Sequence, residues 1–363
     1  MTEIINDDIP NITMSQLPMI IENCVKLDMV PLILGPSGIG KSDGVKQYAE
    51  KRAEEEGATL WEYGDGPISD PTKFHGFLDF RVALLDVLDA KGMPQIRDNE
   101  TVFLPPSLLP NIEKHGATGE LFLDELPQGF PSVTNALSQL VLGGKIGDSY
   151  VLPEGWVIIS AGNEKRDGAA TNNIGAQMLN RVSGFRVSPD VPSFIKYLNE
   201  IGSDGRVGAF MRLRGKDLLH AYKKGLTNFP SPRGWVKVDK ALSIPDAILR
   251  ETIVSGIVGV GPASEFEGFL RMMSELTNWS SICADPHNAR VPDGADAIYA
   301  MLGMVNNKIT GETAEAACAY IVRMPKEFQV LFALDVINDK RKVDVVNTRE
   351  FSSLRLGLGD LIV

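Results

Sequence analysis

Apolar residues in the first half of the chain occur in short uninterrupted runs, and a helical pattern follows the first of them. Residues 29–34 are all apolar, which predicts a short buried strand. Beyond a glycine-rich stretch, Val45, Tyr48, Ala49 and Ala53 recur at the spacing of one helix face, and we expect this helix to stop at Gly57. Strands are also predicted at 120–125, 156–162 and 185–187. Strands separated by helical segments indicate an α/β domain, which we place at residues 1–190.

The second half of the chain has a helical pattern. Apolar residues at helical spacing suit packed helices, and they are Ile253, Ile257, Val258, Phe266, Phe269 and Leu270. A link with two prolines at 188–192 precedes this segment, and a loop-rich stretch at 278–293 follows it. From Ala295 the pattern is helical again. We therefore expect a helical domain at 191–277 and a loop followed by a helical extension at 278–363.

The eight residues after the first predicted strand form a complete G-x-x-x-x-G-K-[ST] loop. They are Gly35, Pro36, Ser37, Gly38, Ile39, Gly40, Lys41 and Ser42. Glycines let backbone N–H groups point inward at a phosphate, Lys41 reaches the β- and γ-phosphates, and the Ser42 hydroxyl is a ligand for Mg²⁺. The strand before the loop and the helix after it are the context that this motif requires. The sequence therefore predicts a site for ATP and Mg²⁺.

Two carboxylates and an amide end the later strands. Asp124 and Glu125 close the strand predicted at 120–125, and Asn163 follows the one at 156–162. After a P-loop, one carboxylate holds the Mg²⁺ shell and its neighbour orients and deprotonates the attacking water, so we assign these roles to Asp124 and Glu125. Asn163 could hydrogen-bond the γ-phosphate and the water, or it could shape a turn. The carboxylate pair predicts hydrolysis.

Two arginines complete the candidate site. Arg181 would end a helix just before the last predicted strand. Ser231 and Pro232 are typical of a helix start, which puts Arg233 in the first helical turn. Because a cation there opposes the helix dipole, an anionic partner such as an ATP phosphate would account for Arg233, and a surface ion pair is the alternative.

Two hairpins are predicted between these motifs. Residues 93–97 and 101–104 flank a turn at Asp98, Asn99 and Glu100, and residues 145–151 have a similar pattern around Gly147. They could contact a partner, or they could be simple surface hairpins.

Composition and charge narrow the setting. The formal net charge is −11, and Asp339 and Asp344 bracket the longest basic run at 340–342, so we do not expect a nucleic-acid patch. A polar, acidic start and no apolar run of spanning length argue against a secretory signal and a membrane segment. The three scattered cysteines suit buried thiols in a reducing compartment. We therefore expect a cytoplasmic protein.

As a set, the motifs resemble those of AAA+ ATPases. The loop at 35–42 is similar to Walker A, 121–125 to Walker B, Asn163 to sensor 1, Arg181 to the arginine finger and Arg233 to sensor 2. Supporting stretches at 70–76, 104–110, 150–156 and 323–329 resemble the MoxR-like branch, particularly small bacterial and phage-type members. The family usually has a phenylalanine after the finger arginine, where this chain has Val182, so Arg166 and Arg186 remain rivals to Arg181.

The resemblance implies a parallel five-stranded sheet of order 5-1-4-3-2 and a helical lid at 191–277 that carries Arg233. It also implies an insertion in helix 2 at about 77–106 and a pre-sensor-1 hairpin at about 145–152. In such ATPases both inserts tend to face a central pore or a partner.

The function that the resemblance implies is Mg²⁺-dependent ATP hydrolysis in a ring, a hexamer, with Arg181 completing the neighbouring subunit's site. MoxR-like ATPases typically pair with von Willebrand factor A domain proteins and act as chaperones in assembly or metal-centre maturation. Two alternatives remain. A nucleic-acid-directed AAA+ motor is disfavoured by the negative charge, and an ATP-gated scaffold with little turnover is disfavoured by Glu125.

Overall fold

The structure is a computed structural model that describes residues 9–164 and 175–359 of the chain. The chain forms two compact units, which divide between Ser188 and Pro189. Among the described residues, no helix combines the length and the apolar character needed to cross a bilayer.

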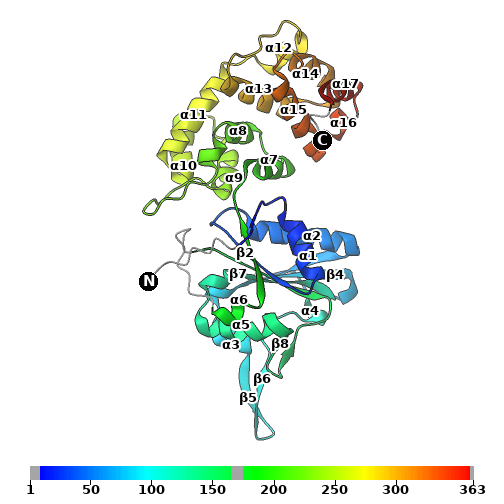
Figure 1. Ribbon diagram of the computed structural model, residues 1–363, viewed down its shortest axis with the longest axis vertical. Coiled ribbons are helices and arrows are strands. Elements are labelled where there is room, and N and C mark those ends of the chain that lie inside the picture. The colour runs from blue at the N-terminus through cyan, green and yellow to red at the C-terminus, as the bar shows by residue number, and fades with distance from the viewer. Residues whose placement is uncertain (1–8, 165–174, 360–363) are drawn as a thin grey trace. The chain divides into compact units, whose positions relative to one another are not determined.

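The N-terminal unit is built on a parallel sheet of seven strands, in the order β1-β11-β2-β10-β7-β4-β3 (Figure 1). Their bounds are β1 Asn11–Ile12, β2 Val30–Leu34, β3 Thr59–Glu62, β4 Phe74–Arg81, β7 Thr118–Asp124, β10 Trp156–Gly162 and β11 Val182–Val187. The predicted α/β class and parallel sheet are confirmed, but the predicted count of five strands is wrong. The five strands from β11 to β4 have the expected order, and β1 and β3 extend the sheet by one strand at each edge.

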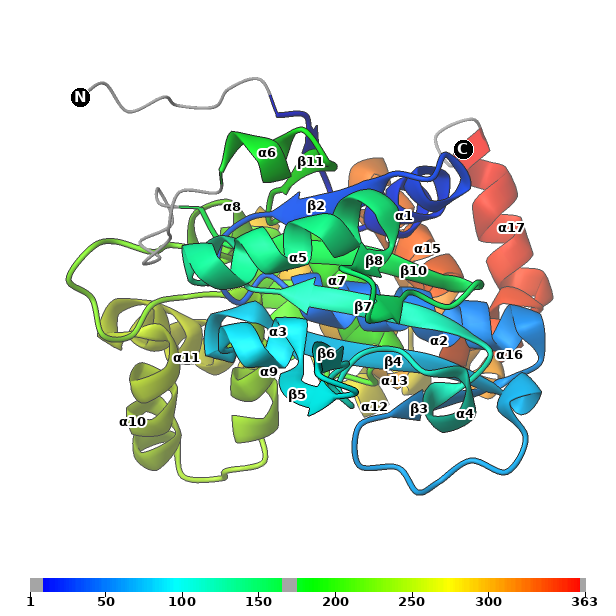
Figure 2. The ribbon, with the colours of Figure 1, turned by 90° about the horizontal axis from the view of Figure 1, so that it is seen from below.

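Alternate residues of the central strands face opposite sides of this sheet. On β2, Leu32 and Leu34 pack with α5, whereas Ile33 between them packs with α1 and α2. Such burial on both faces explains why the strands are apolar runs rather than alternating ones. Figure 1 shows α1 and α2 on one side of the sheet and α5 on the other, and Figure 2 views the α5 side. The bounds are α1 Leu17–Lys26, α2 Lys41–Glu56 and α5 Pro131–Gly143.

Both predicted hairpins are present. Strand β5 (Met93–Arg97) pairs antiparallel with β6 (Glu100–Leu104), and β8 (Lys145–Ile146) pairs antiparallel with β9 (Tyr150–Val151). The first turn contains two residues rather than three, because Glu100 already belongs to β6. Asp98 and Asn99 have φ of 48° and 69°, the left-handed conformation that a two-residue hairpin turn requires. Figure 1 shows the β5–β6 hairpin projecting from the unit.

The rest of this unit consists of short elements between the strands. They are α3 Val87–Lys91, α4 Ile112–His115, α6 Ala176–Leu179 and the 3₁₀ turns η1 Pro71–Lys73, η2 Val82–Leu84 and η3 Leu126–Gln128. Residues 77–81, which the sequence analysis counts with the helix-2 insertion, belong to the buried strand β4. The hairpin and α3 lie between β4 and β7.

Helices alone build the described part of the C-terminal unit. They are α7 Val191–Glu200, α8 Arg206–Leu218, α9 Pro232–Ala241, α10 Ala247–Val258, α11 Val260–Ser274, α12 Trp279–Ala284, α13 Ala295–Lys308, α14 Ala314–Ile321, α15 Lys326–Asn338, α16 Val343–Val346 and α17 Arg349–Leu358. One core gathers mainly α7 to α11 around Phe210, Trp235 and Phe266, and a second gathers α12 to α17. Val258, Phe266, Phe269 and Leu270 are buried as predicted, but Ile253 is 39% exposed.

Candidate nucleotide site

The glycine-rich loop runs from the end of β2 to the start of α2, as the motif requires. Gly35 passes so close to β11 that a Cβ atom there would lie 2.6 Å from the carbonyl oxygen of Val187. Gly40 caps α2 in a left-handed conformation with φ of 99°. Both positions need glycine, so the loop holds a fixed shape in which the N-terminus of α2 is available to an anion.

Lys41 is held inside the loop. Its Nζ donates to the carbonyl oxygens of Gly35 at 2.8 Å and Pro36 at 3.0 Å, and to Oδ1 of Asn163 at 2.8 Å. The residue is 7% exposed. Asn163 follows β10, the strand beside β2, so the sheet brings these two side chains together across 122 positions of sequence. The structure thus places the predicted lysine and the predicted amide in direct contact.

Ser42 and Asp124 are also in contact. The Ser42 hydroxyl donates to Oδ2 of Asp124 at 2.8 Å, and the other oxygen, Oδ1, accepts from the backbone N–H of Glu125 at 2.8 Å. A hydroxyl and a carboxylate are the hard oxygen ligands that Mg²⁺ takes, usually with one or two carboxylates, substrate phosphates and water. The described residues contain no group of three or more His, Cys, Asp or Glu side chains that could hold a metal. Ser42 and Asp124 fit Mg²⁺ that is shared with phosphate and water.

Glu125 has an unusual backbone conformation. Its φ of 56° and ψ of 31° lie in the left-handed region, where it precedes the 3₁₀ turn η3. A side chain other than glycine there costs about 1–3 kcal/mol, and such strain clusters at functional sites. The strain at the end of β7 is consistent with a functional role for this carboxylate.

Asp79 is an acidic residue beside the site that the sequence pattern did not single out. It lies on β4, next to β7, where Arg81 pairs with Asp124. Its Oδ2 accepts from Nε of Arg81 at 3.3 Å, but its Oδ1 is buried without a hydrogen-bond partner among the residues that the structure describes. Burial, and then the charge of Asp124, raise the pKa of Asp79. The strand around it could have been recognised from the apolar residues in FHGFLDFR, but its neighbours could not.

Arg181 lies away from the phosphate loop of the same chain. It precedes β11, and its Nη1 donates to the carbonyl oxygen of Ser138 on α5 at 2.5 Å. Val182 pairs with Val30 at the start of β2, whereas the loop begins after Leu34. The five residues of β2 therefore separate Arg181 from the loop, about 16 Å along the strand.

The structure describes one of the two rival arginines, Arg186. Arg186 is 4% exposed and forms two hydrogen bonds of 2.8 Å with Glu164, so this guanidinium is buried in an ion pair within the unit. A buried, bidentate pair is a poor candidate for a group that reaches another subunit. Arg166 lies outside the described residues.

Arg233 belongs to the C-terminal unit. Ser231 caps α9 by accepting from the backbone N–H of Gly234 at 3.1 Å, and Pro232 is the first helical residue, as predicted. Arg233 is exposed, and the structure gives it no ion pair within the described ranges. The predicted position in the first turn of a helix is confirmed.

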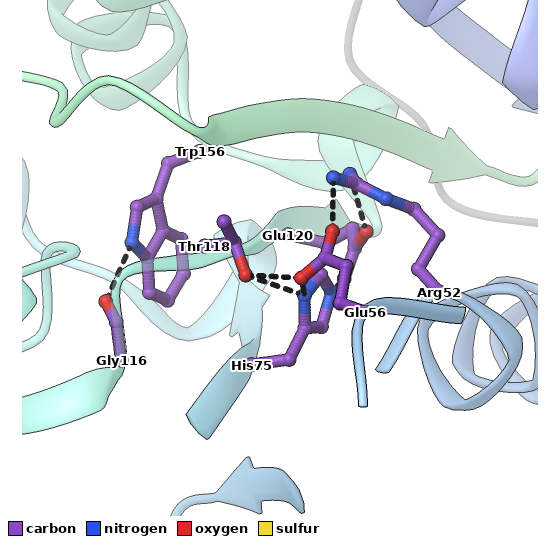
Figure 3. A network of polar contacts seen from close by, with 7 residues as sticks. All are labelled: Arg52, Glu56, His75, Gly116, Thr118, Glu120 and Trp156. Atoms are coloured by element: carbon purple, nitrogen blue, oxygen red, sulfur yellow. Dashed lines mark hydrogen bonds and ion pairs between the residues drawn. The ribbon is translucent and has the colours of Figure 1, made fainter. Parts of the chain in front are cut away.

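A partly buried ionic network holds the far end of α2 against β4 and β7 (Figure 3). Arg52 donates to Glu56 and to Glu120, each at 3.0 Å. His75 lies between the same carboxylates, with Nε2 2.7 Å from Glu120 and Nδ1 2.9 Å from Glu56, and Thr118 donates to Glu56. His75 and Glu120 are fully buried.

Both nitrogens of the His75 ring face carboxylate oxygens, which can only accept, and Nδ1 also lies 2.9 Å from the Thr118 hydroxyl, whose proton goes to Glu56. The geometry therefore favours the doubly protonated imidazolium. Burial alone would lower the pKa of His75, but hydrogen bonds to Glu120 and Glu56 and their charges outweigh it, and the pKa is raised. The network connects the helix that begins at the phosphate loop with the strand that ends at Asp124.

Comparisons with known proteins add little to this geometry. No protein-family model and no curated protein sequence matches the chain. Among solved structures, the chain is similar to NtrX from Brucella abortus in complex with ADP, with a TM-score of 0.33, 15% identity and coverage of 96% of this chain and 68% of that one. For NtrX from the same organism in complex with ATP, the TM-score is 0.31 and the identity is 16%, with 100% and 70% covered. These TM-scores are too low to support an argument.

The chain's own geometry nevertheless defines a class. The P-loop lies between β2 and α2. Its lysine donates a hydrogen bond to the amide that follows β10, and its serine donates one to the carboxylate at the end of β7. This arrangement is typical of a P-loop nucleotide-binding fold. The order of the five central strands is the one that the AAA+ resemblance implies.

Proposed function

We propose that this chain is a Mg²⁺-dependent AAA+ ATPase that works as a hexameric ring and remodels a protein partner. The observation that carries the proposal is the convergence of three distant segments at one edge of the sheet. Lys41 contacts Asn163, and Ser42 contacts Asp124, which adjoins Glu125. Each of these residues has a role in phosphoryl transfer to water.

The residues divide the chemistry among them. Lys41 and the N-terminus of α2 bind the phosphates, and Ser42 and Asp124 would hold Mg²⁺, which neutralises charge on the phosphate oxygens when it is bound. Glu125 accepts a proton from the water that attacks the γ-phosphorus, as the bond to the ADP oxygen breaks. Asn163 orients that water and the γ-phosphate. The roles of Glu125, Asn163 and Arg233, the last as sensor 2 of the lid, come from the resemblance and from position.

The place of Arg181 supports the proposal of a ring. Arg181 lies about 16 Å along the strand from the phosphate loop of the same chain, so an effect of this charge on hydrolysis would be exerted in the site of another subunit. In the proposed ring Arg181, which follows the short helix α6, acts there in the manner of an arginine finger.

The protein partner is inferred from the MoxR-like resemblance and from the hairpins. The β5–β6 hairpin is exposed along nearly its whole length, and it carries Met93, Ile96, Val102 and Phe103, which are 59%, 84%, 38% and 40% exposed. Exposed apolar side chains of this kind mark protein contacts. We propose a partner with a von Willebrand factor A domain and a cytoplasmic setting.

A turnover assay tests this function. ATP hydrolysis should require Mg²⁺, should respond to a protein partner, and should change little with single- or double-stranded DNA or RNA, since an acidic chain lacks the usual electrostatic footprint. Deleting Asp98 and Asn99, or Gly147 and Asp148, should weaken the response to the partner and spare basal turnover. Micromolar DNA binding with several-fold stimulation would favour a nucleic-acid motor. Loss of basal turnover in the deletions would place the hairpins in the active site.

A further inference from the structure

Asp79 stands on the same face of the sheet as the proposed magnesium ligands. On β4, Leu78 and Phe80 pack on the α5 side, and Phe77 packs on the side of α1 and α2. Asp79 alternates with Leu78 and Phe80, so it shares the face of Phe77. On the neighbouring strand β7, Asp124 lies on this same face, because it bonds Ser42 of α2. The two aspartates are therefore diagonal neighbours across adjacent strands, with Arg81 paired to Asp124.

The Asp79 carboxylate is only half satisfied. Arg81, which is 61% exposed, donates a hydrogen bond to one oxygen of Asp79. The other oxygen is buried with no hydrogen-bond donor from the described part of the chain. A buried acceptor without a donor destabilises the fold, and a charged one does so more strongly. A second negative charge, that of Asp124, adds to the cost. Such an arrangement is stabilised when a cation or its bound water supplies the missing donor.

We propose that Asp79 is a further member of the magnesium site, where its Oδ1 accepts a hydrogen bond from a water bound to Mg²⁺. This inference rests on the proposed function, and it makes Asp79 a positioning residue beside the ligands Ser42 and Asp124. Mg²⁺ usually keeps several waters, and groups that orient the ligands of a metal alter its affinity by about 10–100-fold when they are replaced. Two other carboxylates near the loop do not share these features. Glu62 is paired with Lys46, and Asp43 is exposed.

The test measures metal affinity and does not depend on turnover. Binding of a fluorescent ADP analogue is titrated with Mg²⁺, and Mn²⁺ binding is followed by electron paramagnetic resonance, for the wild type and for Asp79→Asn. Asp79→Asn should raise the Mg²⁺ concentration at half-saturation about 10-fold or more. It should leave binding of the analogue in EDTA unchanged. Asp43→Asn removes the same charge from the first turn of α2, and it should stay within about two-fold of the wild type because exposed charges are screened.

A fold check accompanies the titration. The Asp79 side chain is 33% exposed, but one of its oxygens is buried without a donor from the described residues, and Asn carries no charge there. Thermal melting in EDTA should therefore show Asp79→Asn to be at least as stable as the wild type; if the variant does not fold, Asp79→Ala is titrated instead. Unchanged Mg²⁺ and Mn²⁺ affinities in the Asp79 variant, alongside a clear loss in Asp124→Asn, would overturn the proposal and leave the proposed function intact. A wild-type protein that binds no nucleotide at any Mg²⁺ concentration would overturn both.

Discussion

Lys41 and Glu125 belong to one proposed site but act on different states of the substrate. Lys41 holds phosphate in the ground state, so Lys41→Ala should abolish ATP binding. Glu125 acts on the attacking water in the transition state, so Glu125→Gln should bind ATP normally and should hydrolyse it about 10²–10⁴-fold more slowly. Nucleotide titration and single-turnover hydrolysis measure the two effects separately.

Matched controls exist for both variants. Lys51→Ala changes an exposed lysine of the same helix, and Glu113→Gln changes an exposed glutamate on α4, so neither should affect binding or turnover. Equal loss of ATP binding in Lys41→Ala and Glu125→Gln would contradict the assigned roles.

At this scale, the sequence predicted the residues whose signal is local. The loop, the carboxylate pair and the amide each sit at the end of an apolar run, and the structure joins Lys41 to Asn163 and Ser42 to Asp124. Asp79 could not be found in this way. The proposed role of Asp79 depends on β4 lying beside β7, and the neighbours of a strand cannot be inferred from a single sequence.

At the scale of elements, the contact of α2 with β4 and β7 should depend on pH. The pKa of His75 is raised in the folded state, so its contribution to stability is full below the unfolded value of about 6.5 and is lost as the pH rises through the folded value. The free energy of unfolding should therefore fall above pH 6.5, by at most about 1.4 kcal/mol per pH unit from this group. His75→Gln should remove that slope and should destabilise the fold by about 3–5 kcal/mol, because the network loses a buried cation.

Chemical denaturation between pH 6 and pH 9 checks this prediction. His287→Gln changes an exposed histidine in the other unit, and it should keep the wild-type slope. A His75→Gln profile parallel to that of the wild type would show that His75 is not the titrating group. The pKa of Arg52 is raised and the pKa of Glu56 is lowered, so these two groups stay charged across this range and do not obscure the result.

The elements differ in how well the sequence predicts them, for physical reasons. Both hairpins were predicted because turn chemistry is local: Asp98 and Asn99 adopt the left-handed conformation at modest cost. The edge strands were missed. Strand β1 is two residues long and β3 is four, and their place in the sheet comes from pairing with β11 and β4. The apolar run of β4 is interrupted by His75 and Asp79, whose polar groups serve the network and the proposed metal site.

For the whole molecule, the pattern predicts an α/β part followed by a helical part, and the described residues have that order. The N-terminal unit carries the phosphate loop and Arg181, and the C-terminal unit carries Arg233. Within the C-terminal unit, two apolar cores follow one another along the chain. The lid at 191–277 and the extension at 278–363 remain predictions, as does the ring.

Mixing two inactive variants tests the central claim most directly. Arg181→Ala subunits should bind nucleotide and lose turnover, and Glu125→Gln subunits should do the same. Co-assembled rings contain some interfaces with both Glu125 and Arg181 intact, so mixing should restore part of the activity, and the arginine is worth about 10³–10⁵ in rate. The control mixes the double variant Arg181→Ala/Glu125→Gln with Arg181→Ala. Every subunit of this mixture lacks Arg181, so no interface has both residues intact and ATPase activity should not be restored. Partial rescue in the first mixture alone is the predicted result. No rescue in verified mixed rings, or full ATPase activity in a strictly monomeric protein, would contradict the account.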